Sequence, residues 1–371
     1  MKKIKFLLTF SIMLLGSIPA KSYIYGQYPD AMVRILHDGE HVYFCCYKGV
    51  SVLDKTTGSW TSYSYKNGML PGEMQTAMAL HADTLWVGSS NGWVSAICDG
   101  KVESWRYKII SDLTKSEFYG NVGEIAFDTQ GRMVLGIVNC VMGVVNGEPL
   151  QCYPIPSSVC EQSVEGMQFD AHGVLWVACA GLLYENALTR YTFEGGIDFL
   201  LKRLEKPHPF QFDHCCCLAV DKNGVLWFNP GNQLVKYDGE TFTLQKTITH
   251  ANDMAFDAQG RLWLVGNYGG LYCFDHGEVT HYPYQREMWF CLDIDGDVIY
   301  IGTQNGLLKF ENGEFTPFEI LESYATAIRP PLAVPDNIAM PRMFTLDGRP
   351  IENGSTAKGV IIKNGRKVVQ R

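Results

Sequence analysis

A short phrase of strands and turns recurs seven times along the chain. Each copy has a turn, a strand centred on Trp or a substitute for it, a Gly-containing turn, and a second strand that ends near Asp-Gly or Asn-Gly. The clearest copies begin at Phe169, Val220 and Phe256. The central positions are Tyr43, Trp86, Val134, Trp176, Trp227, Trp263 and Tyr300. Their spacing ranges from 36 to 51 residues, with an average of about 43, and a period of this length predicts the blades of a β-propeller.

We therefore expect an all-β fold, a seven-bladed β-propeller of four-stranded blades with a small C-terminal β appendage. One blade cannot bury both faces of its sheet, so the blades must pack against each other. In the sixth copy the pattern predicts strands over 252–256, 261–265, 270–274 and 279–282. Trp263 is expected between neighbouring blades, where a large aromatic buries the most area. Two junctions between copies are longer, and 197–204 has the apolar spacing of a short helix.

The first 22 residues have the pattern of a signal peptide. Lys2, Lys3 and Lys5 precede a mostly apolar stretch over 6–18, and small residues at Ala20 and Ser22 suit a cleavage site. The apolar stretch is too short for a membrane span. We expect an exported protein, located in the periplasm, on the outer surface or in the medium. The propeller is expected over 23–324, with 23–28 as a candidate closing strand.

Composition changes after the seventh copy. Residues 325–342 contain four prolines and predict an extended linker. Residues 343–371 contain two strand-like runs about an Asn-Gly turn, which predicts a separate β-hairpin tail.

Charge and cysteine content exclude some functions. The net charge is −8 and no basic patch is interleaved with aromatics, so a nucleic-acid partner is not expected. The twelve cysteines include adjacent runs at 45–46 and 215–217 inside predicted strands, where neighbouring side chains point to opposite faces. We interpret them mainly as buried small hydrophobes rather than disulfides or zinc ligands.

The repeat also indicates which residues lie at the mouth of the central channel, where the innermost strand of each blade begins. The position thirteen residues before each central residue is polar in all seven copies: Asp30, Glu73, Asn121, Ser163, His214, His250 and Glu287. These residues are our candidate ligand-binding set. A wet, polar channel mouth without any ligand gives the same pattern.

Two chemical roles follow from the residue types. Asp30, Glu73 and Glu287, adjacent around a closed ring, could hold a divalent cation such as Ca²⁺ or Mg²⁺ through oxygen. His214 and His250, in neighbouring blades, are candidates for acid–base catalysis.

The phrase D-x-x-G-x-L-W followed by G-L-x-x-(Y/F)-D resembles the two-component-regulator propeller repeat, which builds periplasmic sensor domains and free-standing exported proteins. Trp86, Trp176, Trp227 and Trp263 carry the resemblance, and Tyr43 and Val134 depart from it. Streptogramin lyases have similar phrases and use a Glu-x-His motif, but Ile248 stands where that Glu is required before His250. The tail over 343–371 resembles C-terminal sorting tails of type IX secretion cargo.

These observations favour an exported, monomeric propeller that recognises a small polar ligand, a glycan or a protein without catalysis. The alternative is a metal-assisted lactonase or lyase that uses the polar ring.

Overall fold

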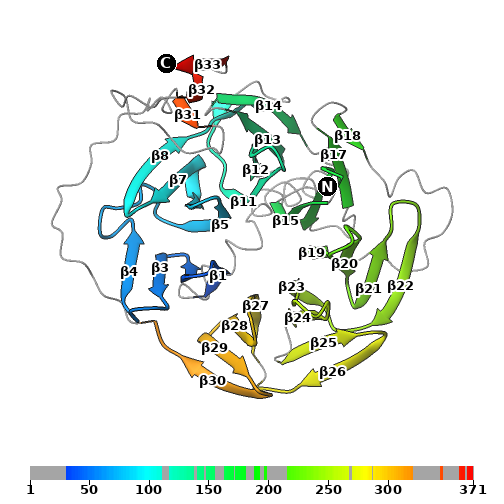
Figure 1. Cartoon of the computed structure of the whole chain (residues 1–371). Helices are drawn as coiled ribbons and strands as arrows, with labels where there is room; N and C mark the ends of the chain where they lie inside the picture. The colour runs from blue at the N-terminus through cyan, green and yellow to red at the C-terminus, as the bar shows by residue number, and fades with distance from the viewer. Residues whose placement is uncertain are drawn as a thin grey trace, which may run out of the picture.

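The computed structural model places seven four-stranded antiparallel sheets around a central axis, within the residues that it describes (Figure 1). These residues are 31–110, 117–137, 140–145, 148–154, 163–170, 172–180, 188–192, 196–198, 215–266, 270–285, 287–320, 343–345, 359–363 and 366–370. The predicted propeller of four-stranded blades is confirmed. No helix in these ranges is long and apolar enough to cross a membrane.

Each of the first three blades consists of four strands that follow one another in the sequence. Blade one comprises β1 (Met32–His37), β2 (His41–Cys46), β3 (Gly49–Asp54) and β4 (Trp60–Ser64). Blade two comprises β5 (Gln75–His81), β6 (Thr84–Ser89), the 3₁₀ turn η1 (Ser90–Gly92), β7 (Trp93–Cys98) and β8 (Lys101–Arg106). A small pair, β9 (Ile109–Ile110) and β10 (Glu117–Phe118), precedes blade three. Blade three comprises β11 (Val122–Phe127), β12 (Met133–Ile137), β13 (Cys140–Val145) and β14 (Glu148–Pro154).

The other four blades repeat this order. Blade four comprises β15 (Ser163–Phe169), β16 (Leu175–Ala180), β17 (Leu188–Thr192) and β18 (Gly196–Asp198). Blade five comprises β19 (Cys215–Val220), β20 (Leu226–Pro230), β21 (Gln233–Tyr237) and β22 (Phe242–Thr247). Blade six comprises β23 (Ala251–Phe256), β24 (Leu262–Gly266), β25 (Leu271–Asp275) and β26 (Glu278–Tyr282). Blade seven comprises β27 (Trp289–Asp295), β28 (Val298–Thr303), β29 (Gly306–Glu311) and β30 (Glu314–Phe318).

The strands predicted for blade six agree with the structure to within one residue at each end. The helix predicted over 197–204 is wrong at its start, because Ile197 and Asp198 pair in β18 with Tyr191 and Arg190. Residues 199–204 lie outside the described residues.

The ring closes between blades one and seven. Each innermost strand contacts the innermost strand of the next blade, and β27 contacts β1. Every blade is built from consecutive strands, so the described sheets close the ring by packing and not by strand exchange. The closing strand expected over 23–28 lies outside the described residues.

The ring has two faces with different construction. Innermost strands begin at one face, where the longer connections lie, and we name it the loop face. They end at the other face, where tight hairpins join the first strand of each blade to the second, and we name it the turn face.

On the turn face, the D-x-x-G-x-x-W phrase is a hydrogen-bonded unit. In blade six, Asp257 Oδ1 accepts the backbone N–H groups of Gln259 and Arg261 at 3.0 and 2.8 Å, and Gly260 adopts a φ of +85°, which favours glycine. Asp257 Oδ2 accepts the indole Nε1–H of Trp263 at 2.8 Å. The same indole–carboxylate bond joins Trp176 to Asp170 and Trp227 to Asp221. The repeated Asp therefore stabilises the turn and also accepts the hydrogen bond of the buried indole N–H.

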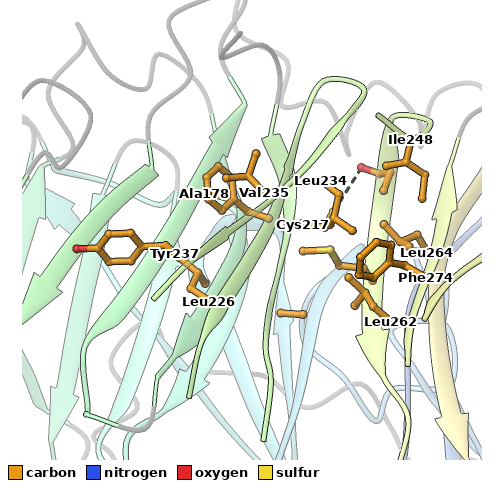
Figure 2. Packing of buried hydrophobic residues seen from close by; sticks show 14 of the residues in the cluster. Ala178, Cys217, Leu226, Leu234, Val235, Tyr237, Ile248, Leu262, Leu264 and Phe274 are labelled. Carbon is orange, nitrogen blue, oxygen red and sulfur yellow. Dashed lines mark hydrogen bonds between the residues drawn. The ribbon is translucent and has the colours of Figure 1, made fainter. Parts of the chain in front are cut away.

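The core lies mainly between the blades. Trp263, which is 4% exposed, belongs to a buried cluster with Trp289, Ile301 and Phe310 of blade seven, as predicted. Figure 2 shows the same interdigitation between blade five and blade six, where Cys217 and Leu234 lie close to Leu262, Leu264 and Phe274. Each blade is therefore held by its neighbours.

Several cysteines are buried, as the sequence analysis predicts. Cys45, Cys217, Cys273 and Cys291 are buried, and burial raises the pKa of the Cys273 thiol to about 11. The run 215–217 lies within β19, as expected.

A separate sheet of β31 (Met343–Thr345), β32 (Gly359–Lys363) and β33 (Arg366–Gln370) forms the C-terminal appendage, so the expected hairpin has a third strand.

Candidate functional site

Five of the seven residues predicted for the channel mouth lie among the described residues, and their surroundings differ. Glu73 is exposed, and Asn121 accepts the backbone N–H of Asn91 at 3.2 Å. His250 is half-buried, and its Nδ1 lies 3.1 Å from the carbonyl oxygen of Gly231. Ser163 begins β15, and Asp30 and His214 lie outside the described residues. The acid–base role of His214 and His250 therefore stays a prediction.

Glu287 is a buried carboxylate that three neutral groups satisfy. It is 7% exposed; its Oε1 accepts Trp289 Nε1–H at 3.2 Å, and its Oε2 accepts Asn305 Nδ2–H at 2.5 Å. Thr303 Oγ1 lies 3.4 Å from the same Oε2. Because the donors come from β27 and from β28 and the residues after it, Glu287 fixes the loop-face end of blade seven.

These contacts do not suit Glu287 to a cation site, because its oxygens already accept protein donors. Across the described ranges, no group of three or more His, Cys, Asp or Glu side chains is placed to hold a metal ion. The metal set of Asp30, Glu73 and Glu287 includes one residue outside those ranges and stays a prediction.

Charged side chains instead meet at the axis of the ring, deeper than the predicted positions. Arg34 of β1 donates through Nη2 to both oxygens of Glu124 of β11. These strands belong to blades one and three, which are separated by blade two, so the pair joins two blades that are not neighbours in the ring. The Arg34 side chain is 24% exposed and that of Glu124 is 4% exposed. Attraction to Glu124 raises the pKa of Arg34, and burial opposes that effect.

Two more carboxylates contribute to this axial cluster, which we define as Arg34, Tyr47, Glu124, Glu165 and Asp253. Burial raises the pKa of Asp253, although Arg34 and the backbone N–H groups of Leu292 and Met254 favour its ionised form. Burial first, and then the charge of Glu165, raises the pKa of Tyr47. The cluster therefore draws on blades one, three, four and six.

The axial cluster also contains a donor that lacks a partner among the described residues. Arg34 Nε is buried and makes no hydrogen bond with the described residues. A buried donor left unpaired costs about 1–3 kcal/mol, so its position indicates an acceptor that the axis can accommodate.

A β-bulge places these residues. The pairing of the innermost strand with its neighbour shifts by one residue between Met32 and Arg34, and between Val122 and Glu124. All seven blades have this irregularity at the equivalent place. The bulge brings the two residues at and after it to the axis, nine to eleven positions before each central residue. A count of thirteen therefore selected residues that precede the innermost strand in six blades and the first strand residue, Ser163, in blade four.

A second cluster lies on the loop face of blade two. The guanidinium of Arg106 lies 3.6 Å from the ring centroid of Tyr119 and 5.4 Å from that of Trp93. Lys108 lies 5.8 Å from Tyr119 and pairs with Glu117 of β10. This stack could not be predicted from the residue pattern, because its members come from three separate segments.

Comparison with known proteins identifies the fold and no family. No protein-family profile matches the chain, and no curated protein matches it in sequence. Virginiamycin B lyase from Staphylococcus aureus is similar in structure, with a TM-score of 0.59 and 16% identity over 76% of this chain and 94% of that one. The WD40 propeller of Doa1 has a TM-score of 0.58 at 12% identity, covering 79% of this chain and 95% of that one. PorZ, a bacterial surface component of the type-IX secretion system of Porphyromonas gingivalis, has a TM-score of 0.58 at 15% identity, covering 76% of this chain and 46% of that one. Identities this low establish a common β-propeller architecture and nothing about activity.

Proposed function

We propose that this protein is an exported propeller that binds a small, uncharged, hydroxyl-bearing ligand such as a glycan at the axial cluster, without chemical change. The observation that carries the proposal is Arg34, which joins blades one and three, is partly exposed and keeps a buried Nε–H without a partner among the described residues.

The charges at the axis favour this ligand class. One guanidinium faces the carboxylates of Glu124 and Asp253. A simple anion would be repelled by the carboxylates, and a simple cation at Glu124 would have to displace Arg34, which occupies both of its oxygens. A hydroxyl group donates to a carboxylate and accepts from a guanidinium, so a sugar can satisfy both.

Export and delivery are part of the proposal. The signal-peptide pattern over 1–22 supports export, and the tail over 343–371 resembles type IX sorting tails. Cell fractionation and N-terminal sequencing test this: we expect a mature chain that begins near Tyr23, at the cell surface. Retention of the full protein in the cytoplasm would contradict it, and deletion of 343–371 should leave the protein in the periplasm.

Binding is tested by thermal shift and calorimetry with a panel of uncharged mono- and disaccharides, compared with glucuronate and glucosamine. A ligand at one hundred times its Kd stabilises the folded state by about 2.7 kcal/mol, which is measurable as a rise in Tm. We expect an uncharged sugar to raise Tm more than either charged analogue.

The matched variants are Arg34→Lys and Arg132→Lys. Both arginines pair with a carboxylate whose side chain is 4% exposed, but Arg132 and Asp128 lie on the turn face. Arg34→Lys should abolish the sugar-dependent rise, and Arg132→Lys should keep it. An equal rise in both variants, or none in the native protein, would contradict the axial site. Turnover of quinupristin, followed by chromatography and mass spectrometry, would favour the lyase alternative instead.

A further inference from the structure

The junction between blades one and seven carries a charged cluster at its turn-face end. His37 ends β1, and Asp293 and Asp295 lie at the end of β27. His37 Nδ1 lies 2.6 Å from Asp293 Oδ2, and its Nε2 lies 3.9 Å from Asp295 Oδ1. Lys55 of blade one pairs with Asp295 Oδ2 at 2.7 Å.

Both ring nitrogens of His37 therefore face a carboxylate. A neutral imidazole has one N–H, so it can donate to only one of them. The imidazolium has two N–H groups and suits both positions. Protonation also balances the cluster, since two carboxylates of blade seven then face two cations of blade one.

This junction has a special role because it closes the ring. The strands of blades one and seven are far apart in sequence, and no described strand is exchanged between the two sheets. What joins them is packing, including the cluster of Met32, Ile35, Phe44, Cys291 and Tyr300. Gly302 also allows a close approach, because a Cβ there would lie 2.4 Å from Met32 Cβ. Contacts that cross the junction therefore bear on the closure of the whole ring.

We propose that His37, with Asp293, Asp295 and Lys55, is a pH-sensitive clasp that tightens the closure of the propeller as the pH falls toward 6. Arg34 lies three residues before His37 on β1, so the clasp also bears on the position of the axial cluster.

The direction of the effect follows from linkage. The hydrogen bond to Asp293 raises the pKa of His37 above its ordinary 6.5; burial and Lys55 oppose this, while the charges of Asp293 and Asp295 add to it. A group with a raised pKa in the folded state stabilises that state fully below its unfolded pKa. The stabilisation is lost as the pH rises through the folded-state pKa. The other ionisable pair at this corner, Asp38 and His41, lies within blade one at 3.4 Å and does not cross the junction.

The test compares Tm at pH 6 and pH 8 in the native protein and three variants. His37→Gln keeps a donor that cannot ionise, and Asp293→Asn removes the main partner. His276→Gln is the matched control, because His276 pairs with its neighbour Asp275 inside blade six. For a partly exposed pair we expect the fall in Tm from pH 6 to pH 8 to be about 1–3 °C larger in the native protein than in His37→Gln or Asp293→Asn. His276→Gln should behave like the native protein.

Hydrogen exchange locates the effect. After correction for intrinsic exchange rates, amides of β1 and β27 should be less protected at pH 8 than at pH 6, and this difference should vanish in His37→Gln. An NMR titration of His37 in the native protein gives a readout that needs no variant to fold. A His37 pKa of 6.5 or below, or the same pH dependence of Tm in His37→Gln and the native protein, would overturn the proposal.

Discussion

The two faces of the propeller are built by different rules. On the turn face, Asp128, Asp170, Asp221 and Asp257 each accept the backbone N–H groups two and four residues later, at 2.8 to 3.0 Å. On the loop face the contacts differ from blade to blade. Glu287 anchors one connection, Asn229 another, and Arg106 stacks on Tyr119 in a third. The repeated face specifies the fold, and the irregular face is where differences between blades can serve binding.

The contacts made beside the bulge, in the interior of the ring, also differ from blade to blade. Thr76 and Asn252 occupy the bulge in their strands and donate to carbonyl oxygens of the next blade, at 2.6 and 2.7 Å. Arg34 passes over blade two to reach Glu124. Side chains at or beside the bulge therefore tie neighbouring blades, or two blades with one between them, depending on their length and charge.

The largest effect is expected from Glu124→Gln. It removes the carboxylate that Arg34 pairs with and leaves the guanidinium without its ion-pair partner. Breaking a buried pair in this way costs about 3–5 kcal/mol, measured as the free energy of unfolding in urea. The control Glu117→Gln removes the partner of Lys108 on the surface and should cost little. The double variant Arg34→Met/Glu124→Leu should recover most of the loss. Equal stabilities of Glu124→Gln and Glu117→Gln would show that the axial pair is not a structural tie.

The next effect is expected from Asp257→Ala on the turn face. The Asp257 side chain is 2% exposed, and its loss leaves Trp263 Nε1 and two backbone N–H groups without their acceptor. We expect a cost of about 2–3 kcal/mol at neutral pH. Blade two already lacks this bond, since Trp86 Nε1 is buried without a hydrogen-bond partner among the described residues, so the variant makes blade six resemble blade two.

The stability lost in Asp257→Ala should depend on pH in the acid range. Burial would raise the pKa of Asp257, but hydrogen bonds from Trp263 and Arg261 outweigh it and lower the pKa below 3.8. The contribution of Asp257 is therefore present above pH 3.8 and is lost as the pH falls through its folded-state pKa. The difference in unfolding free energy between native protein and Asp257→Ala should shrink below pH 4. A constant difference down to pH 3 would contradict this account.

The sequence predicts the repeated features because each is local. Asp257, Gly260 and Trp263 lie within seven residues, so turn, strand and buried aromatic can be recognised together, and the spacing of such units gives the ring. The two-residue turn between Asp295 and Val298, which pair with each other, is another local feature of this kind. Arg34 and Glu124 were not predicted because they lie 90 positions apart. Their meeting depends on the closure of the ring and on a bulge that the residue pattern does not reveal.

A smaller effect is expected from Thr76→Val, which tests the ties between neighbouring blades. Thr76 is 4% exposed, and its hydroxyl donates to the Val122 carbonyl at 2.6 Å. Valine keeps the shape but leaves that carbonyl without this donor, so we expect a cost of about 1–2 kcal/mol in urea unfolding. Ser51→Ala is a control, because the Ser51 hydroxyl pairs with Ser62 within blade one. A cost no larger than that of the control would mean that apolar packing alone joins the blades at this level.

The smallest effect should be a gain, and it comes from blade two, one of the three blades whose first turn lacks the D-x-x-G phrase. Blade two connects β5 to β6 through Ala82 and Asp83, without the D-x-x-G phrase, and Ala82 adopts a φ of +51°. This conformation costs a residue with a Cβ about 1 kcal/mol, and Asn tolerates it better than Ala. Ala82→Asn should therefore raise the free energy of unfolding by about 0.5 kcal/mol and Tm by about 1–2 °C. Ala79→Asn in β5 provides a contrast, because it is a strand position without positive φ and should destabilise the fold. A loss of stability in Ala82→Asn would mean that blade two depends on this turn for something other than its backbone conformation, and that the turn face is less uniform than its other blades indicate.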